Sequence, residues 1–192
     1  MRIDRNYLKE SVSTVLSITS FRGNYAFLSN FYPAPVIYLG KRYANNEAAF
    51  QAQKTSCAKE QQRFCLPYLT DPAKAKSLGR KVTLRPDWDA MKIQCMYEIC
   101  MCKFFQHTEL RDALLATGNI LLVEGNTWGD YFWGQVDGIG ENHLGIILMD
   151  IREKLRCSML EERRLFSNEE IITDKRTGKL QKWNYRQYPK MD

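Results

Sequence analysis

The sequence predicts a single α+β domain that is mostly helical and contains a few short strands. Three observations support this fold class. A chain of 192 residues is long enough for one well-buried domain and short for two. Helical apolar patterns and helix caps recur after residue 45, whereas runs suited to strands are few and short. The regular strand–helix alternation of a doubly wound parallel sheet is missing.

The first elements are expected to be short. Residues 1–18 form a lead-in with a weak helix or strand pattern, and residues 18–43 are rich in Phe, Tyr and Pro. We expect short strands with irregular connections in the second segment. Pro33 and Pro35 exclude a helix there, because proline lacks the backbone N–H that a helix interior needs.

Helices dominate the middle of the chain. Asn45 or Asn46 can cap a first helix, and Glu47 in its first turn suits the helix dipole. A short helix is expected over residues 72–79, because an aspartate precedes it, a proline opens it and a glycine ends it. The longest helix of the chain is expected over residues 85–106.

The apolar stripe of that longest helix consists of Trp88, Met91, Cys95, Ile99, Cys102 and Phe105. A further helix is expected over residues 108–117, with Gly118 ending it. A short apolar strand over residues 120–124 then leads into a glycine-rich loop, and a last helix is expected over residues 142–155.

Composition indicates a soluble protein, with 44% hydrophobic and 26% charged residues. Since no segment resembles a membrane span or a signal peptide, we expect a cytoplasmic protein. The six cysteines are expected to be free thiols, and no metal or cofactor is expected. A zinc site would need a ligand framework, and the sequence has only two histidines and no CxxC pair.

The net charge of +6 is partly located near the end of the chain, where basic and aromatic residues alternate. These residues are Lys175, Arg176, Lys179, Lys182, Trp183, Tyr185, Arg186, Tyr188 and Lys190. Such interleaving suits nucleic acid, so nucleic acid is a possible partner of this segment. A solvated strand or hairpin explains the pattern equally well, and the phosphates of a small ligand would account for a modest basic excess.

Residues 128–149 are the most informative segment, because they combine two tryptophans, acids, an asparagine and five glycines before an apolar helix. We expect a ligand pocket here, with Asp130 and Trp133 in its wall. The glycine turn before Asn142 would offer free backbone N–H groups to an anion at the helix start. The structural alternative is a glycine-rich surface loop with partly buried tryptophans.

A second group of candidates lies on one side of the first helix. Glu47, Phe50, Gln51 and Lys54 are spaced by three, four and seven residues, so that they share a face. A carboxylate, an amide and an amine on one face can converge on one ligand. A solvated face with a Glu–Lys pair is the alternative.

A third group lies near the start of the chain. Ser29 and Asn30 form a predicted turn that presents hydrogen-bonding groups beside the aromatic ring of Phe31. Arg22 precedes this turn, and Arg80 supplies a further positive charge after the second helix.

In chain order, these segments read FLSNF (27–31), NEAAFQAQK (46–54), LGR (78–80), RPDW (85–88), LAT (115–117), YFWG (131–134), GENHLG (140–145) and LM (148–149). This succession resembles the NADAR family, named for NAD and ADP-ribose and also called the YbiA-like N-glycosidases. The family's helix usually reads SEHYFQAQK, which Glu47, Phe50, Gln51 and Lys54 match. Its YWG-x-G-x-G-x-N-x-LG pattern is matched by Trp133, Gly134, Asn142, Leu144 and Gly145.

The resemblance covers residues 21–155, which we expect to form the NADAR domain. Residues 1–20 would be a lead-in and residues 156–192 a basic aromatic C-terminal extension. One departure concerns the first helix, where Ala48 and Ala49 replace the His and Tyr of the family. This chain lacks whatever that His contributes to binding or proton transfer, or supplies it otherwise.

The resemblance implies hydrolysis of the bond between ribose C1 and a nitrogen. Two substrates are associated with the family: ADP-ribose attached to guanine, and phosphorylated ribosylamino intermediates of riboflavin synthesis. A non-catalytic NAD- or ADP-ribose-binding module is an alternative, motivated by the two alanines. A nucleic-acid-binding protein that uses the basic extension is another, and it is compatible with hydrolysis of a modified base.

We expect Glu47, Lys54 and Asp130 to be catalytic. Glu47 or Asp130 would stabilise an oxocarbenium-like sugar. Lys54 would neutralise a phosphate or a carboxylate, or form a Schiff base with ring-opened C1. The expected substrate-binding residues are Arg22 and Arg80 for phosphate, Trp88 and Trp133 for stacking, Asn30 and Asn142 for ribose hydroxyls, and Ser29, Phe31, Phe50, Gln51 and Gly134.

Overall fold

The computed structural model describes residues 16–167, with side chains through residue 161. The chain divides into two compact units, Met1–Glu153 and Lys154–Asp192, and the fold and cavity below belong to the first. The part of the predicted lead-in before residue 16 and the part of the predicted extension after residue 167 lie outside the described residues. The predictions for the basic aromatic segment therefore remain predictions.

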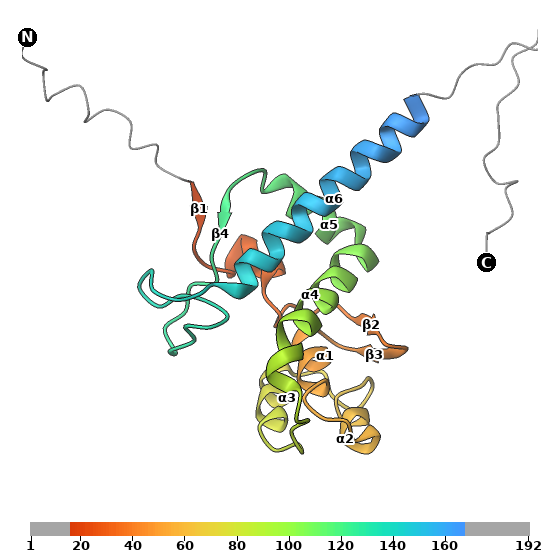
Figure 1. Ribbon diagram of the computed structural model, residues 1–192, viewed down its shortest axis with the longest axis vertical. Helices are drawn as coiled ribbons and strands as arrows, with labels where there is room; N and C mark the ends of the chain where they lie inside the picture. Colours follow the sequence, from red (N-terminus) through yellow and green to blue (C-terminus); the bar gives the residue numbers. More distant parts are fainter. Residues whose placement is uncertain (1–15, 168–192) are drawn as a thin grey trace, which may run out of the picture. The chain divides into compact units, whose positions relative to one another are not determined.

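The described part of the chain is α+β and mainly helical, as predicted (Figure 1). In chain order its elements are β1 (Ser17–Ile18), the 3-10 helix η1 (Gly23–Leu28), β2 (Val36–Tyr38), β3 (Lys41–Tyr43), α1 (Asn46–Ala52), α2 (Ala58–Gln62), α3 (Pro72–Gly79), α4 (Trp88–Gln106), α5 (Thr108–Ala116), β4 (Leu121–Leu122) and α6 (His143–Ser167).

The strands form two small sheets. β1 pairs in parallel with β4, in the register Ser17 to Leu121 and Ile18 to Leu122. β2 and β3 form an antiparallel hairpin in which Val36 lies opposite Tyr43. The β1–β4 pairing brings the start of the described chain beside the segment that leads into the glycine-rich loop, and so joins two parts of the candidate site.

The predicted helix starts are confirmed where a side chain caps them. Asn45 accepts a hydrogen bond from the backbone N–H of Ala48 at 2.9 Å. Asp71 accepts hydrogen bonds from the first turn of α3, which begins at Pro72 and ends at Gly79. Gly79 has a second role, because a Cβ at this position would lie 1.8 Å from Oε1 of Gln51.

Several predicted boundaries are wrong. Within residues 16–167, the longest helix is α6 with 25 residues, not α4 with 19. It begins at His143 rather than at Asn142, because Asn142 has a positive φ of 54°. The segment of expected strands also contains η1, and α2 was not predicted.

The buried face of α4 also differs from the predicted stripe. Phe105 is 61% exposed, and its neighbour Phe104 is fully buried instead. The buried residues of α4 are Trp88, Cys95, Met96, Ile99, Cys100, Lys103 and Phe104. Apolar periodicity alone missed this face because it includes a lysine, which hydrogen bonds to distant backbone keep buried.

Helix α1 lies at the centre of the first unit, in contact with α3, α4 and β3. Every residue of α1 is buried. The polar residues Glu47 and Gln51 are therefore not a solvated face, which removes the structural alternative for this helix. No helix in the described part of the chain is both long and apolar enough to span a bilayer.

Candidate active site

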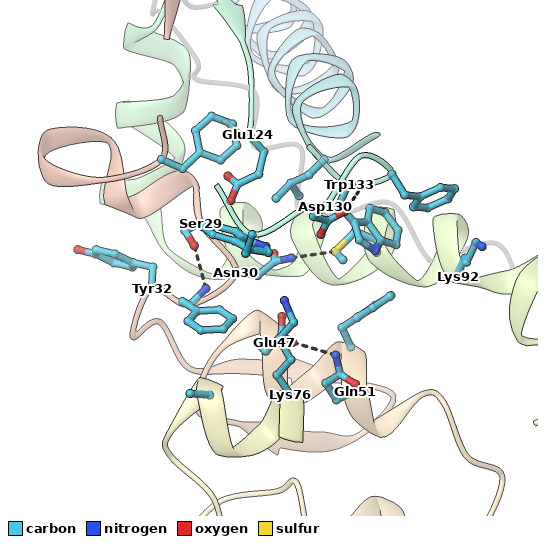
Figure 2. Close-up of a pocket in the computed structure, with 18 of the residues that line it drawn as sticks. Ser29, Asn30, Tyr32, Glu47, Gln51, Lys76, Lys92, Glu124, Asp130 and Trp133 are labelled. Atoms are coloured by element: carbon cyan, nitrogen blue, oxygen red, sulfur yellow. Dashed lines mark hydrogen bonds between the residues drawn. The ribbon is translucent and has the colours of Figure 1, made fainter. Parts of the chain in front are cut away.

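A cavity of about 910 Å³ brings together the three groups of candidate residues (Figure 2). Its walls come from η1 and the turn after it, from α1 and α3, from the start of α4, and from the loop after β4. The predicted residues that line it are Arg22, Ser29, Asn30, Phe31, Glu47, Phe50, Gln51, Lys54, Arg80, Trp88, Asp130 and Trp133. Of the predicted site residues, Gly134 and Asn142 do not line it.

Glu47 is the most deeply placed carboxyl group of the cavity, with 6% of its surface exposed. Its Oε1 accepts a hydrogen bond from Nε2 of Gln51 at 2.8 Å, and its backbone N–H donates to the carbonyl of Asn30 at 3.1 Å. Burial raises the pKa of Glu47, although the hydrogen bond from Gln51 and the charges of Lys76 and Lys54 oppose this shift.

Glu124 is a second carboxyl group of the cavity, partly buried, which the sequence analysis missed. It faces Glu47 from the opposite wall (Figure 2), and its buried Oε2 atom has no hydrogen-bond partner among the described residues. Burial, and secondarily the charge of Asp130, raise the pKa of Glu124 to about 7. The available signal was a glutamate that ends an apolar strand and directly precedes Gly125 in the loop.

Asp130 lines the cavity on the same side as Glu124 (Figure 2). Its Oδ1 accepts a hydrogen bond from the backbone N–H of Trp133 at 2.8 Å, and its own backbone is held by the side chain of Asn126. The three carboxyl groups are not grouped closely enough to form a metal site, and neither is any other set of three potential ligands in the described residues.

Positive charges surround these carboxyl groups. Burial lowers the pKa of Lys54, while the charge of Glu47 opposes this shift. Lys76 and Lys92 also line the cavity, and neither was predicted. With Arg22 and Arg80 they provide several cations around one space, an arrangement that suits an anionic ligand such as a phosphate.

Aromatic rings form another part of the wall. Phe50 contacts Trp88 with ring centroids 5.1 Å apart and Trp133 with centroids 5.4 Å apart. Trp128 was not predicted as a site residue and is 53% exposed. Arg22 and Lys76 each lie 5.9 Å from the centre of its ring. The cavity can therefore accommodate a flat ring and an anionic group together.

Gly134 and Asn142, which were expected to bind substrate, do not line the cavity and have structural contacts instead. A Cβ on Gly134 would lie 2.1 Å from the carbonyl oxygen of Glu124, so this glycine permits close backbone packing. The side chain of Asn142 donates to the carbonyl of Leu122 and accepts from the N–H of Glu124. Its amide is therefore engaged by the backbone of the β4 segment.

The expected anion site at the start of α6 is also wrong. The backbone N–H groups of residues 141–144 donate to the carbonyls of Tyr131, Gly134, Phe132 and Trp133, respectively. These groups would have to be free to hold an anion. The glycine-rich loop folds back onto the helix start and uses them itself.

Replacing Asn142 with alanine is expected to lower the free energy of unfolding by about 2–4 kcal/mol, because two buried hydrogen bonds and a residue suited to positive φ are lost. Urea denaturation would measure this. Asn24→Ala, at an exposed position, is the control. An Asn142→Ala protein as stable as the wild type would contradict the structural role.

The two alanines that depart from the family pattern lie outside the cavity lining. Ala48 and Ala49 are 1% and 0% exposed and form part of the core. The carboxyl groups, amines and aromatic rings described above are present without them. Neither alanine contributes an atom to the cavity wall.

Comparisons with known proteins agree with this fold. A model of the NADAR domain matches residues 19–156. The protein named N-glycosidase YbiA from Escherichia coli (strain K12) is 38% identical over 145 residues, which are 74% of this chain and 89% of that protein. The NMR structure of E. coli YbiA has a TM-score of 0.67 and 37% identity, covering 76% of this chain and 87% of that one.

A second relative is the protein named riboflavin biosynthesis protein VVA0006 from Vibrio vulnificus (strain YJ016). It is 38% identical over 136 residues, which are 69% of this chain and 36% of that longer protein. The matched family model spans the cavity and all the elements that form its walls. By sequence and by fold, the chain belongs to the NADAR domain family.

Proposed function

We propose that this protein is an N-glycosidase that hydrolyses the bond between ribose C1 and a nitrogen in a phosphorylated substrate. The observation that carries the proposal is a pair of carboxyl groups on opposite walls of one cavity, the buried Glu47 and the partly buried Glu124. Hydrolysis of a glycosidic bond needs a proton donor and a stabilising negative charge, and two carboxyl groups in different surroundings can divide these tasks.

Glu124 is the proton donor in this mechanism. Its raised pKa keeps a substantial protonated fraction near neutral pH. The proton moves from Glu124 to the leaving nitrogen, and the C1–N bond breaks with its electron pair remaining on nitrogen. Water then adds to C1 and returns a proton to the Glu124 carboxylate, which restores the starting state.

Glu47 stabilises the positive charge that develops on the sugar. Lys54 and Lys76 favour its charged form, and the hydrogen bond from Gln51 orients it. Lys54 supplies positive charge beside this carboxylate. Asp130 adds negative charge on the opposite wall, where it also helps to keep Glu124 protonated.

The remaining cavity residues support a substrate that combines a planar base, a ribose and phosphate. Trp88 and Trp133 provide apolar walls, and Arg22 and Arg80 provide charges for phosphate. Two substrate types share this chemistry: ADP-ribose linked to guanine, and a phosphorylated ribosylamino pyrimidine. The name of the Vibrio relative supports the second, and a volume of about 910 Å³ leaves room for the first.

The proposal is tested by incubating the protein with an oligonucleotide carrying ADP-ribosylated guanine and, separately, with a ribosylaminopyrimidine phosphate. We expect release of ADP-ribose from the first or of ribose phosphate from the second, or both, detected by mass spectrometry. Release from the oligonucleotide alone identifies a base-repair hydrolase, and release from the small phosphate alone identifies metabolite clean-up. Binding of ADP-ribose without turnover of either would instead support the non-catalytic module.

A further inference from the structure

Lys103 is a buried cation that the proposed mechanism does not use. It lies on α4, is 1% exposed and does not line the cavity. No salt bridge to it is found among the described residues. Burial lowers the pKa of Lys103 to about 8. Keeping an amine in such a place is costly unless hydrogen bonds compensate for the lost water.

The compensation comes from the turn that carries Ser29 and Asn30. Nζ of Lys103 donates to the backbone carbonyls of Phe27 at 2.5 Å and Ser29 at 2.9 Å. The ammonium group also lies 5.4 Å from the centre of the Tyr32 ring. One side chain thus binds residues on both sides of the turn that forms part of the cavity wall.

This turn is joined directly to the proposed catalytic carboxylate. The carbonyl of Asn30 accepts a hydrogen bond from the backbone N–H of Glu47 at 3.1 Å. The side chain of Asn30 donates to Sδ of Met96, which lies on α4 two turns before Lys103. The segment that contains Ser29 and Asn30 therefore links Lys103 to the backbone of Glu47. Helix α4 contacts this segment through two side chains, those of Met96 and Lys103.

We propose that Lys103 is a positioning residue that fixes the Ser29–Asn30 turn, and through it the backbone of Glu47, in the geometry the reaction needs. The inference rests on the proposed function. An apolar side chain of similar length would fill the same volume without burying a charge. Such a side chain would lack the N–H donors that bind the carbonyls of Phe27 and Ser29.

The test compares Lys103→Met with Arg152→Met as a matched control. Arg152 is also a buried cation, and it donates to Oγ1 of Thr117 and to the carbonyl of Ile120, away from the cavity. Each protein is assayed at the same temperature interval below its own Tm, so that losses of stability are matched. Hydrogen exchange of the Glu47 amide is measured alongside kcat and KM.

We expect Lys103→Met to lower kcat about 100-fold, as small misplacements of catalytic groups do, with a smaller change in KM. The Glu47 amide should exchange faster than in the wild type. Arg152→Met should leave both quantities close to their wild-type values. Lys103→Gln, which keeps one amide donor, should recover part of the lost protection and of kcat, and it replaces the Met variant if that protein does not fold.

Equal kcat and equal Glu47 protection in the Lys103 and Arg152 variants would overturn the proposal, leaving Lys103 a structural residue only. Faster exchange without any change in kcat would overturn it as well. If the wild-type protein turns over no ribosyl substrate, the proposed function fails, and the kcat comparison cannot be made. The exchange measurement still decides whether Lys103 holds the backbone of Glu47, so the two failures are distinguishable.

Discussion

Replacing Glu47 with glutamine is expected to reduce kcat about 1000-fold while leaving the protein folded. Glutamine keeps the shape of the side chain but removes the negative charge that would stabilise the oxocarbenium-like sugar. Removing one preorganised electrostatic group from an active site lowers kcat by about 100- to 1000-fold, and the upper end is expected here because Glu47 is buried. The product released from the preferred substrate would be quantified by mass spectrometry.

Stability separates this catalytic effect from unfolding. Glu47 is buried and its pKa is raised by burial, so its charge is costly to the folded state. Glu47→Gln should therefore keep or raise Tm in thermal unfolding at pH 7. Glu109→Gln, an exposed change on α5, is the matched control and should alter neither Tm nor kcat. Full activity in Glu47→Gln would remove Glu47 from the mechanism.

Replacing Glu124 with glutamine is expected to lower kcat by about 100- to 10,000-fold, the usual contribution of a general acid. The wild-type kcat/KM should fall as pH rises through about 7, because Glu124 of the free enzyme loses the proton that it donates. In the variant, this decrease should disappear from the residual activity. The measurement is a kcat/KM profile from pH 5 to pH 9, and a variant that keeps the wild-type decrease would assign it to another group.

The same substitution has a consequence for stability. The folded pKa of Glu124 is about 7, above its ordinary value of 4.5. The stability contributed by this carboxyl group is therefore fully present below pH 4.5 and is lost as pH rises through 7. The shift corresponds to as much as about 3 kcal/mol. Glu124→Gln should show a smaller decrease in unfolding free energy than the wild type between pH 5 and pH 8, measured by urea denaturation.

Local sequence predicted the parts of the fold that depend on neighbouring residues. The caps Asn45 and Asp71 bond to N–H groups two or three positions later, so residue type and spacing are sufficient to place the starts of α1 and α3. The buried face of α4 could not be obtained in this way. Lys103 is buried because carbonyls of Phe27 and Ser29 reach it from another part of the chain.

The candidate site shows the same division. Glu47 and Lys54 were predicted together because helical spacing places them on one face. Glu124 and Lys76 were missed because they are identified by their proximity to cavity residues from other elements, and Glu124 also by its loss of contact with water. The expected contact of Asn142 with ribose has a related explanation. The sequence shows that Asn142 carries an amide, but it does not show that this amide bonds to the backbone of Leu122 and Glu124.

The sequence by itself determined the α+β class, the starts of the capped helices and, through its motifs, the family to which the chain belongs. Only the tertiary structure decided which polar groups face the cavity and which are taken up by the backbone. The reason is physical. Caps and helical faces are set by bonds between near neighbours, whereas the protonation and accessibility of Glu47, Glu124 and Lys103 depend on burial by residues from distant segments.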